Sequence, residues 1–392
     1  MAITSEQSEL GSSAEVQTRV IDADGHIFEP EATFASLDPA FYPRRPVMVD
    51  LPPDTMTRDS NRVWMIDGRA VPTLTGRGAT FFTLPGSLSS TKKKVALADQ
   101  TLQDVEARLR GMDQYGVAVQ VIYPTMFLVS AVEDVALEGA LYRAYNQYMS
   151  DVCSRSKGRL KWAALIPWRD PQAALKELQW ASDRGAAGIF TMGVIFDHQL
   201  NDPLFFPIYE AAGEFDLPVC VHLGWGAPAA TQLFSDYSFF CGATIPVIWG
   251  FVHVMASGLL GRFPKLRVGF IETGAEWVPY VVNQVRRNLE PVSDLRVVDA
   301  GAKTRRGAPS LYRDPIEWFR DGRAFVSFET DEDIPYILDH IGADGLMIST
   351  DYPHSDPSAD ENFVAKLQAR TDLSGTVKEK LLYRNAEQFY RL

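Results

Sequence analysis

The sequence predicts an α/β fold, and within that class a closed TIM-type (β/α)8 barrel with an insertion after the first strand. Eight short runs rich in β-branched and aromatic residues occur along the 392-residue chain. Helical patterns separate these runs, which is typical of parallel strands joined by helical crossovers. No glycine-rich phosphate loop follows the first run, so a doubly wound sheet is the less favoured alternative.

Each predicted strand is a short, mainly apolar run of the kind found in sheets that are covered on both faces. The runs are residues 19–24, 117–124, 160–168, 186–192, 217–223, 266–272, 323–329 and 345–350. The crossovers carry recognisable helix boundaries: the segment 170–185 begins with Asp-Pro and ends with Gly.

Three regions do not fit the βα repeat. Residues 1–18 are polar and acidic and are expected to form a disordered tail, so the barrel domain is placed at residues 19–392. Residues 31–98 are rich in Pro, Arg and Thr and are assigned to an insertion over the barrel mouth, with a hairpin turn at Asp67-Gly68. Residues 291–322 are expected to form a long polar connection before the seventh strand.

The composition excludes several classes of protein. Apolar residues make up 46% and charged residues 22%, as in globular proteins, and the net charge of −12 argues against nucleic acid or an anionic membrane as partner. The three cysteines are too few for a disulfide framework, and a cytoplasmic location is expected. Cys220 is interpreted as a core residue, and the apolar run 244–261 as a buried helix of a large domain.

Residues of the types that bind metals occur at the C-terminal ends of four predicted strands. They are Asp24 and His26 on the first strand, His222 on the fifth, Glu272 on the sixth and Asp351 on the eighth, with His354 three residues later. A barrel brings these strand ends to one face, so the side chains are expected to converge. Carboxylates gathered in this way repel one another unless a cation holds them. The sequence therefore predicts a metal site, and mixed imidazole and carboxylate ligands suit zinc, iron or manganese.

Four motifs together resemble the amidohydrolase superfamily, in its decarboxylase-like second family. The motifs are "DADGH" (22–26), "VHLG" (221–224), "RFPKLRVGFIETGAEW" (262–277) and "STDYPH" (349–354). The resemblance covers most of residues 19–392. It implies a TIM barrel that holds zinc or manganese and catalyses hydrolysis or nonoxidative decarboxylation. It also implies metal ligands at Asp24, His26, His222 and Asp351.

The sequence departs from this family at Glu272, where the decarboxylases usually carry a histidine that acts as acid and base. With Glu29 and His354 as further candidates, the metal ligands number seven: Asp24, His26, Glu29, His222, Glu272, Asp351 and His354. Seven ligands suit two ions better than one. The motifs "IETGAEW" (271–277) and "DYPH" (351–354) together make the chain also similar to a branch of TIM-barrel proteins that includes the nonheme diiron monooxygenase of platensimycin and platencin biosynthesis.

This second resemblance implies a site with two iron ions, in which Glu272 and Asp351 take part in catalysis. The expected activity is hydroxylation of an unactivated carbon of a hydrophobic substrate, such as a diterpenoid held as a coenzyme A thioester. The expected partners are O2 and an external electron donor (a reductase or ferredoxin), and a homodimer is expected from relatives.

Two sets of residues are candidates for binding such a substrate. The aromatic residues after the fifth strand could contact its hydrophobic part: Trp225, Phe234, Tyr237, Phe239, Phe240 and Trp249. Basic residues of the insertion could contact coenzyme A phosphates: Arg58, Arg62, Lys92, Lys93 and Lys94.

Two alternatives to the monooxygenase stay open. The first is a zinc or manganese enzyme, either an amidohydrolase-type hydrolase or a nonoxidative decarboxylase, in which Glu272 or Glu276 would be the base. The second is a barrel that binds a metal or a hydrophobic ligand without turnover.

Overall fold

The computed structural model describes residues 19–52, 62–73, 76–80, 84–85, 96–234, 239–289, 313–355 and 358–392. The predicted tail at residues 1–18 lies outside these ranges, as does most of the predicted connection at 291–322. Residues 313–322 of that connection include a short helix, α12.

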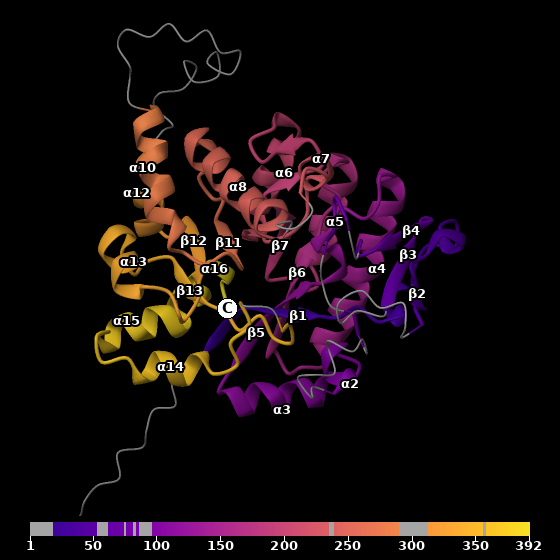
Figure 1. Ribbon diagram of the computed structural model, residues 1–392, viewed down its shortest axis with the longest axis horizontal. Coiled ribbons are helices and arrows are strands. Elements are labelled where there is room, and N and C mark those ends of the chain that lie inside the picture. The colour runs from indigo at the N-terminus through magenta and orange to yellow at the C-terminus, as the bar shows by residue number, and fades with distance from the viewer. Residues whose placement is uncertain are drawn as a thin grey trace, which may run out of the picture.

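An eight-stranded parallel sheet forms the centre of the protein and confirms the predicted strands. Its order is β1 (Ile21–Ile27), β5 (Val119–Pro124), β6 (Leu160–Leu165), β7 (Gly188–Met192), β10 (Val219–His222), β11 (Val268–Ile271), β12 (Ala324–Phe328) and β13 (Leu346–Ile348). The strands are buried and rich in Val, Ile and Phe, as expected for strands covered on both faces. Figure 1 shows them running through the middle of the molecule with helices outside them.

The barrel closes between its first and last strands through backbone contacts just beyond β13. Gly25 and Tyr352 form a parallel bridge, and the amide of His26 donates to the carbonyl of Tyr352 at 2.7 Å. The amide of Asp351 donates to the carbonyl of Asp24 at 2.9 Å. The closure therefore places two segments from opposite ends of the chain side by side.

Helices occupy the crossovers, as the barrel prediction requires. They are α2 (Leu97–Gln100), α3 (Val105–Tyr115), α4 (Val135–Ser154), α5 (Pro171–Ser182), α6 (Phe206–Glu214), α7 (Pro228–Thr231), α8 (Ile245–Ala256), α9 (Leu259–Arg262), α10 (Trp277–Leu289), α12 (Pro315–Arg320), α13 (Ile334–Ile341), α14 (Phe363–Ala369), α15 (Gly375–Glu379) and α16 (Asn385–Tyr390). Several begin with an aspartate cap: Asp170 Oδ1 accepts hydrogen bonds from the amides of Gln172 and Ala173. Among the described residues, no helix is both long and apolar enough to cross a membrane.

The insertion contains a small antiparallel sheet of β2 (Val47–Asp50), β3 (Arg62–Ile66) and β4 (Arg69–Val71). Asp67 and Gly68 have φ of 50° and 80°, so the predicted hairpin turn is confirmed. Arg44 pairs with Asp134 at 2.6 Å, which ties the insertion to the start of α4, and Figure 1 shows the small sheet beside that helix. That the insertion covers the barrel mouth stays a prediction.

Candidate metal centre at the barrel mouth

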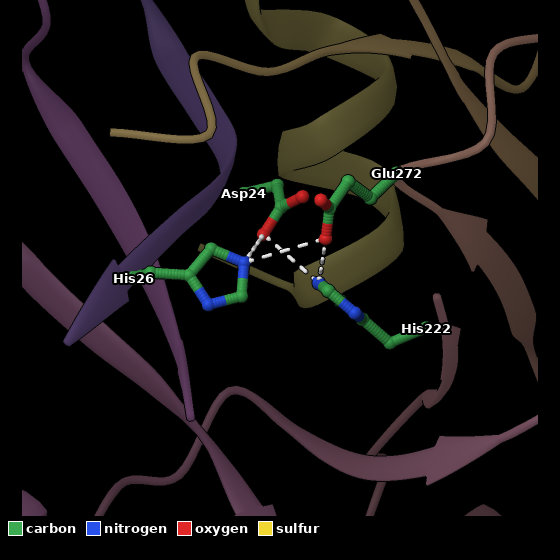
Figure 2. A group of neighbouring side chains, drawn as sticks. All are labelled: Asp24, His26, His222 and Glu272. Carbon is green, nitrogen blue, oxygen red and sulfur yellow. Dashed lines mark hydrogen bonds and ion pairs between the residues drawn. The ribbon is translucent and has the colours of Figure 1, made fainter. Parts of the chain in front are cut away.

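Asp24, His26, His222 and Glu272 point toward one another at the carboxyl ends of three strands (Figure 2). Asp24 and His26 lie on β1, His222 is the last residue of β10, and Glu272 directly follows β11. All four side chains are buried. One ligand atom from each lies within 4.8 Å of the others, so the four side chains could hold one metal ion.

The two histidines present their Nε2 atoms to this group. His26 Nε2 lies 3.3 Å from Asp24 Oδ1 and 3.6 Å from Glu272 Oε2. His222 Nε2 lies 3.3 Å from each of the same two oxygens. The carboxylates of Asp24 and Glu272 are therefore both shared between two imidazoles.

Backbone carbonyls fix the orientation of both rings. His26 Nδ1 donates to the carbonyl of Pro124 at 3.1 Å, and His222 Nδ1 donates to the carbonyl of Leu223 at 2.9 Å. A carbonyl only accepts, so each Nδ1 carries a proton and each neutral ring keeps its lone pair at Nε2. This is the arrangement in which a carbonyl holds the outer nitrogen of a metal-binding histidine.

Asp351 and His354 form a second group that shares His26 with the first. Asp351 Oδ1 lies 2.7 Å from His354 Nδ1 and 3.4 Å from His26 Nε2. The His354 ring stacks on that of His26, with centroids 4.0 Å apart, and also on the Phe28 ring, with centroids 5.3 Å apart. His354 Nε2 is within 2.8 Å of Thr125 Oγ1, so both nitrogens of this ring have protein neighbours.

The electrostatics of the site favour a bound cation. Burial alone would raise the pKa of Asp24, but His222 and His26 outweigh it and hold that pKa below its ordinary value. Burial would lower the pKa of His26, but Asp24 and its neighbouring carboxylates raise that pKa well above its ordinary value. The carboxylates of the site thus favour positive charge on the His26 ring, and a divalent ion supplies such charge at the shared centre.

Two buried atoms of the group test directly whether a metal fits. Asp24 Oδ2 and His26 Nε2 make no hydrogen bond within the described part of the chain. Native proteins rarely leave such atoms without a bond, because each costs about 1–3 kcal/mol. Both atoms are ligand types for zinc and manganese, so the residues present fit a divalent metal.

The backbone is in an unusual conformation at two of these residues. Glu272 has φ of 62° and Asp351 has φ of 52°, in the left-handed region that non-glycine residues seldom adopt. Such conformations cost about 1–3 kcal/mol each and persist where the surroundings impose them. Their occurrence at two candidate site residues is consistent with a functional centre.

The structure places Glu29 outside both groups of candidate ligands. Its carboxylate oxygens accept hydrogen bonds from the backbone amides of Thr125 (3.0 Å) and Met126 (2.9 Å). Burial raises the pKa of Glu29 to about 7. Glu29 therefore holds the chain after β5, where Thr125 contacts His354.

Sequence reasoning missed Thr125 and Ser358. Ser358 Oγ lies 3.1 Å from Asp351 Oδ2 and 3.4 Å from Glu272 Oε1, so it links the two groups. Its position four residues after "STDYPH" was the one available signal. Thr125 carried no signal, because a threonine at the end of a strand is common in proteins of every function.

A small pocket with a cavity volume of about 20 Å³ lies near the site, between β6, β7 and α4. Phe190 and Met192 of β7 line it, and the Phe190 ring packs on His222 with centroids 5.7 Å apart. Leu165, Trp168 and Phe196 add apolar surface, whereas Glu138 and Tyr142 form a polar edge.

None of the described aromatic residues that were expected to contact a substrate lines this pocket, and their role stays a prediction. Trp225 is buried against Phe239, whereas Phe240 and Trp249 are 56% and 40% exposed. Tyr237 lies outside the described residues.

Of the basic residues proposed for coenzyme A, the structure describes Arg62, which pairs with Asp50. Arg58 and Lys92–Lys94 lie outside the described residues. A coenzyme A thioester as substrate stays a prediction.

Known proteins with similar sequences and structures include several decarboxylases. The chain is 24% identical over 318 residues to gamma-resorcylate decarboxylase from Polaromonas sp. (strain JS666), covering 76% of this chain and 90% of that one. An amidohydrolase structure from Mycobacterium avium subsp. paratuberculosis matches with a TM-score of 0.71 at 20% identity, over 95% of this chain and 97% of that one. A 5-carboxyvanillate decarboxylase structure from Novosphingobium aromaticivorans, complexed with manganese, matches with a TM-score of 0.63 at 19% identity, over 76% and 83%.

These relatives correct the predicted function. The nonheme diiron monooxygenase and its two iron ions were the wrong prediction, because the curated relatives are decarboxylases and manganese is bound in a similar structure. The prediction rested on the motifs "IETGAEW" and "DYPH" and on a count of seven ligands. That count included Glu29, whose carboxylate binds backbone amides.

A family model that matches nearly the whole chain shows the family to which the protein belongs. The model of the amidohydrolase family called Amidohydro_2 matches residues 21–392, which include every barrel strand and every candidate ligand. This extent agrees with the barrel, with the ligand types at its mouth and with the four motifs. The chain belongs to the amidohydrolase family.

Proposed function

We propose that this protein is a divalent-metal-dependent decarboxylase that removes CO2 from a hydroxylated aromatic carboxylic acid without oxidation. The observation that carries the proposal is the convergence of buried ligand atoms from Asp24, His26, His222 and Glu272 at the mouth of an amidohydrolase barrel. The decarboxylases among the relatives support the reaction type. Two of these relatives are named for aromatic acids, gamma-resorcylate and 5-carboxyvanillate, which supports the substrate class.

Asp24, His26, His222 and Glu272 would hold the ion, which we infer to be manganese or zinc. When bound, the ion supplies Lewis acidity that stabilises negative charge on the substrate oxygens next to the breaking bond. Glu272 stands where the resemblance to decarboxylases leads one to expect a histidine. Its carboxylate lies near the Nε2 atoms of both His26 and His222, as the Asp24 carboxylate does, so we assign Glu272 to ion binding.

Asp351 and His354 would supply the proton that replaces the carboxylate on the substrate ring. Decarboxylation breaks the bond between the ring carbon and the carboxylate, and CO2 leaves. The electron pair stays on the ring carbon, which then takes up a proton. We propose that Asp351 Oδ1 delivers that proton to the ring carbon. His354 Nδ1, 2.7 Å away, then returns a proton to Asp351.

The surroundings of this pair suit the assigned role. Stacking on His26 and on Phe28 holds the His354 ring in place, and Thr125 Oγ1 forms a hydrogen bond with its Nε2. Both members of the pair are buried, so water has little access to the carbanion that forms when CO2 leaves.

The test is an assay for CO2 without oxygen. Manganese-loaded protein is incubated anaerobically with gamma-resorcylate, 5-carboxyvanillate and a panel of related phenolic acids in D2O. We expect CO2 release and a product carrying deuterium at the vacated ring position. If the panel releases no CO2 while esters, lactones or amides are cleaved, the protein is a hydrolase and the proposal is wrong.

Two variants separate ion binding from proton transfer. Asp351→Asn cannot carry the proton and should lower the rate of CO2 release by about 10²–10⁴-fold while the ion stays bound. His222→Ala should lose both the ion and the activity. An Asp351→Asn variant with the activity of the wild type would exclude the assigned proton donor.

A further inference from the structure

A buried arginine lies behind the candidate metal site and contacts neither group of ligand atoms. Arg108 of α3 has no exposed surface, and its guanidinium makes five hydrogen bonds. Nε donates to Asp99 Oδ1 at 2.8 Å, and Nη1 donates to Gln120 Oε1 at 2.9 Å and to the Tyr352 carbonyl at 3.5 Å. Nη2 donates to the carbonyls of His26 at 2.8 Å and Asp99 at 3.3 Å. An arginine has five N–H groups, so every donor is used.

Two of these acceptors are carbonyls of the segments that carry the site. The His26 carbonyl belongs to β1, and Tyr352 lies between Asp351 and His354. The Tyr352 hydroxyl donates to Asp99 Oδ2 at 2.7 Å, and the ring lies 4.8 Å from the Arg108 guanidinium. Asp99 thus bonds Arg108 with one oxygen and Tyr352 with the other.

A second set of buried hydrogen bonds reaches the loop 350–354 through Thr350, the residue before Asp351. Gln120 Nε2 donates to Asp22 Oδ2 at 2.7 Å. Asp22 in turn accepts from the amide of Thr350 at 2.9 Å and from its hydroxyl at 2.5 Å. The residues on both sides of Asp351 are therefore tied to strand β1 and helix α3 through buried polar groups.

This arrangement matters because the site spans the barrel seam, the junction between β1 and the loop after β13 where the barrel closes. The strand that carries Asp24 and His26 and the loop that carries Asp351 and His354 come from opposite ends of the chain. They meet at the Gly25–Tyr352 bridge. Metal coordination tolerates ligand displacements of only a few tenths of an ångström. A shift across this seam would therefore disturb ion binding and the proton pair together.

We propose that Arg108, with Asp99 and Tyr352, forms a positioning cluster that fixes β1 against the loop 350–354 and so sets the affinity of the site for its ion. The inference rests on the proposed metal-dependent function. It adds three residues that bind neither ion nor substrate. Asp99 is the penultimate residue of α2, directly after the insertion, so the cluster also joins the end of the insertion to the site.

Manganese binding tests the cluster without relying on activity. Mn²⁺ affinity is measured by EPR, which counts free ion and records the spectrum of bound ion. Arg108→Lys keeps the charge but cannot reach five acceptors, and Tyr352→Phe removes one hydroxyl and keeps the ring. We expect about 10–100-fold weaker binding in each, with an altered spectrum of the bound ion, as found when outer partners of metal ligands are removed.

Arg267→Lys is the matched control. Arg267 is also buried and donates to the carbonyls of Phe389 and Asp216 and to the Asp216 carboxylate, but it lies at the amino end of β11. Its replacement should weaken folding without changing Mn²⁺ affinity. Equal loss of affinity in this control would show a general effect of destabilisation and would overturn the inference.

The outcomes distinguish this inference from the function on which it rests. If the wild type binds Mn²⁺ and both Arg108→Lys and Tyr352→Phe bind it with wild-type affinity and spectrum, the positioning cluster is rejected and the metal site stands. If Arg108→Lys does not fold, Tyr352→Phe decides alone. If the wild type binds neither manganese nor zinc, the proposed function and this inference fail together.

Discussion

His222 combines the features that make a histidine a metal ligand. It is fully buried, Leu223 holds its Nδ1, and its Nε2 lies 3.3 Å from two carboxylate oxygens. Removing an outer partner of a metal ligand costs about 10–100-fold in affinity. His222→Ala should therefore weaken Mn²⁺ binding by more than about 100-fold, as measured by metal analysis after dialysis. His253→Ala, a change outside both ligand groups, should leave the metal content unchanged.

The cysteines differ in their surroundings and should differ in reactivity. Burial raises the pKa of both Cys153 and Cys220 to about 12, so almost no thiolate forms at pH 8. Cys241 is partly exposed. We expect iodoacetamide to modify Cys241 alone in the folded protein and all three after denaturation, as read by mass spectrometry. Modification of Cys220 as fast as Cys241 would contradict its placement in the core.

The sequence could indicate which residue types gather at the strand ends but not what each side chain bonds. His26 and Glu29 are three residues apart and look equally suited to bind metal. In the structure His26 presents a nitrogen to the site, whereas Glu29 binds two backbone amides. Ser358 was missed because its contact with Asp351 depends on the path of a loop, and side-chain pattern does not encode that path.

The loop after β11 depends on one carboxylate from the next crossover. Glu332 accepts hydrogen bonds from the amides of Ala275 (2.7 Å), Glu276 (2.8 Å) and Glu329 (2.8 Å). Glu332→Gln places an amide group against these donors and should lower the free energy of unfolding by about 1–3 kcal/mol in urea titrations. An unchanged unfolding midpoint would show that Glu332 does not brace the loop.

The same residue predicts a dependence on pH. Burial raises the pKa of Glu332 above its ordinary value of 4.5. A raised carboxyl pKa means that the folded state binds the proton more tightly than the unfolded state. The contribution to stability is then complete below pH 4.5 and is lost as the pH rises through the raised pKa. The stability of the wild type relative to Glu332→Gln should therefore decrease across that interval.

Two glycines offer a paired test of the turn in the insertion. Gly68 has φ of 80° and open space around it, so Gly68→Ala adds only backbone strain, of about 1–2 kcal/mol. Gly375 opens helix α15 and also has open space, so Gly375→Ala should be neutral or stabilising because alanine favours helix. Hydrogen exchange of the β3 and β4 amides should rise only for Gly68→Ala. An equal rise in both variants would exclude the turn as its cause.

The strands were predictable because each is a short apolar run followed by a helix with its own start signal, such as Asp170-Pro171. The insertion was predictable only at its hairpin, where Asp67-Gly68 requires a particular turn. The helix α12 was missed because its six residues lie within a long polar segment.

Binding of the ion should stabilise the whole protein, because the ligands come together only in the folded chain. Free metal at 100 times its dissociation constant stabilises the folded state by about 2.7 kcal/mol. Adding Mn²⁺ should therefore raise the melting temperature, and a chelator should lower it. His222→Ala should show neither change. A melting temperature that changes with neither Mn²⁺ nor chelator would argue against a metal bound between the strands of the barrel.

The barrel and its family could be predicted from the sequence, but the branch within the family could not. The motifs around Asp24, His222 and Asp351 are shared by proteins with different reactions on one scaffold. A count of carboxylates and histidines does not distinguish oxygen chemistry from decarboxylation. That distinction depends on which atoms face the ion.

The central claim is that a divalent metal binds between Asp24, His26, His222 and Glu272. Anomalous diffraction from a crystal grown with Mn²⁺, recorded on both sides of the manganese absorption edge, tests it most directly. The account predicts a strong peak within bonding distance of the two Nε2 atoms and of both carboxylates. Water alone among these four side chains, or manganese bound elsewhere in the molecule, would contradict it.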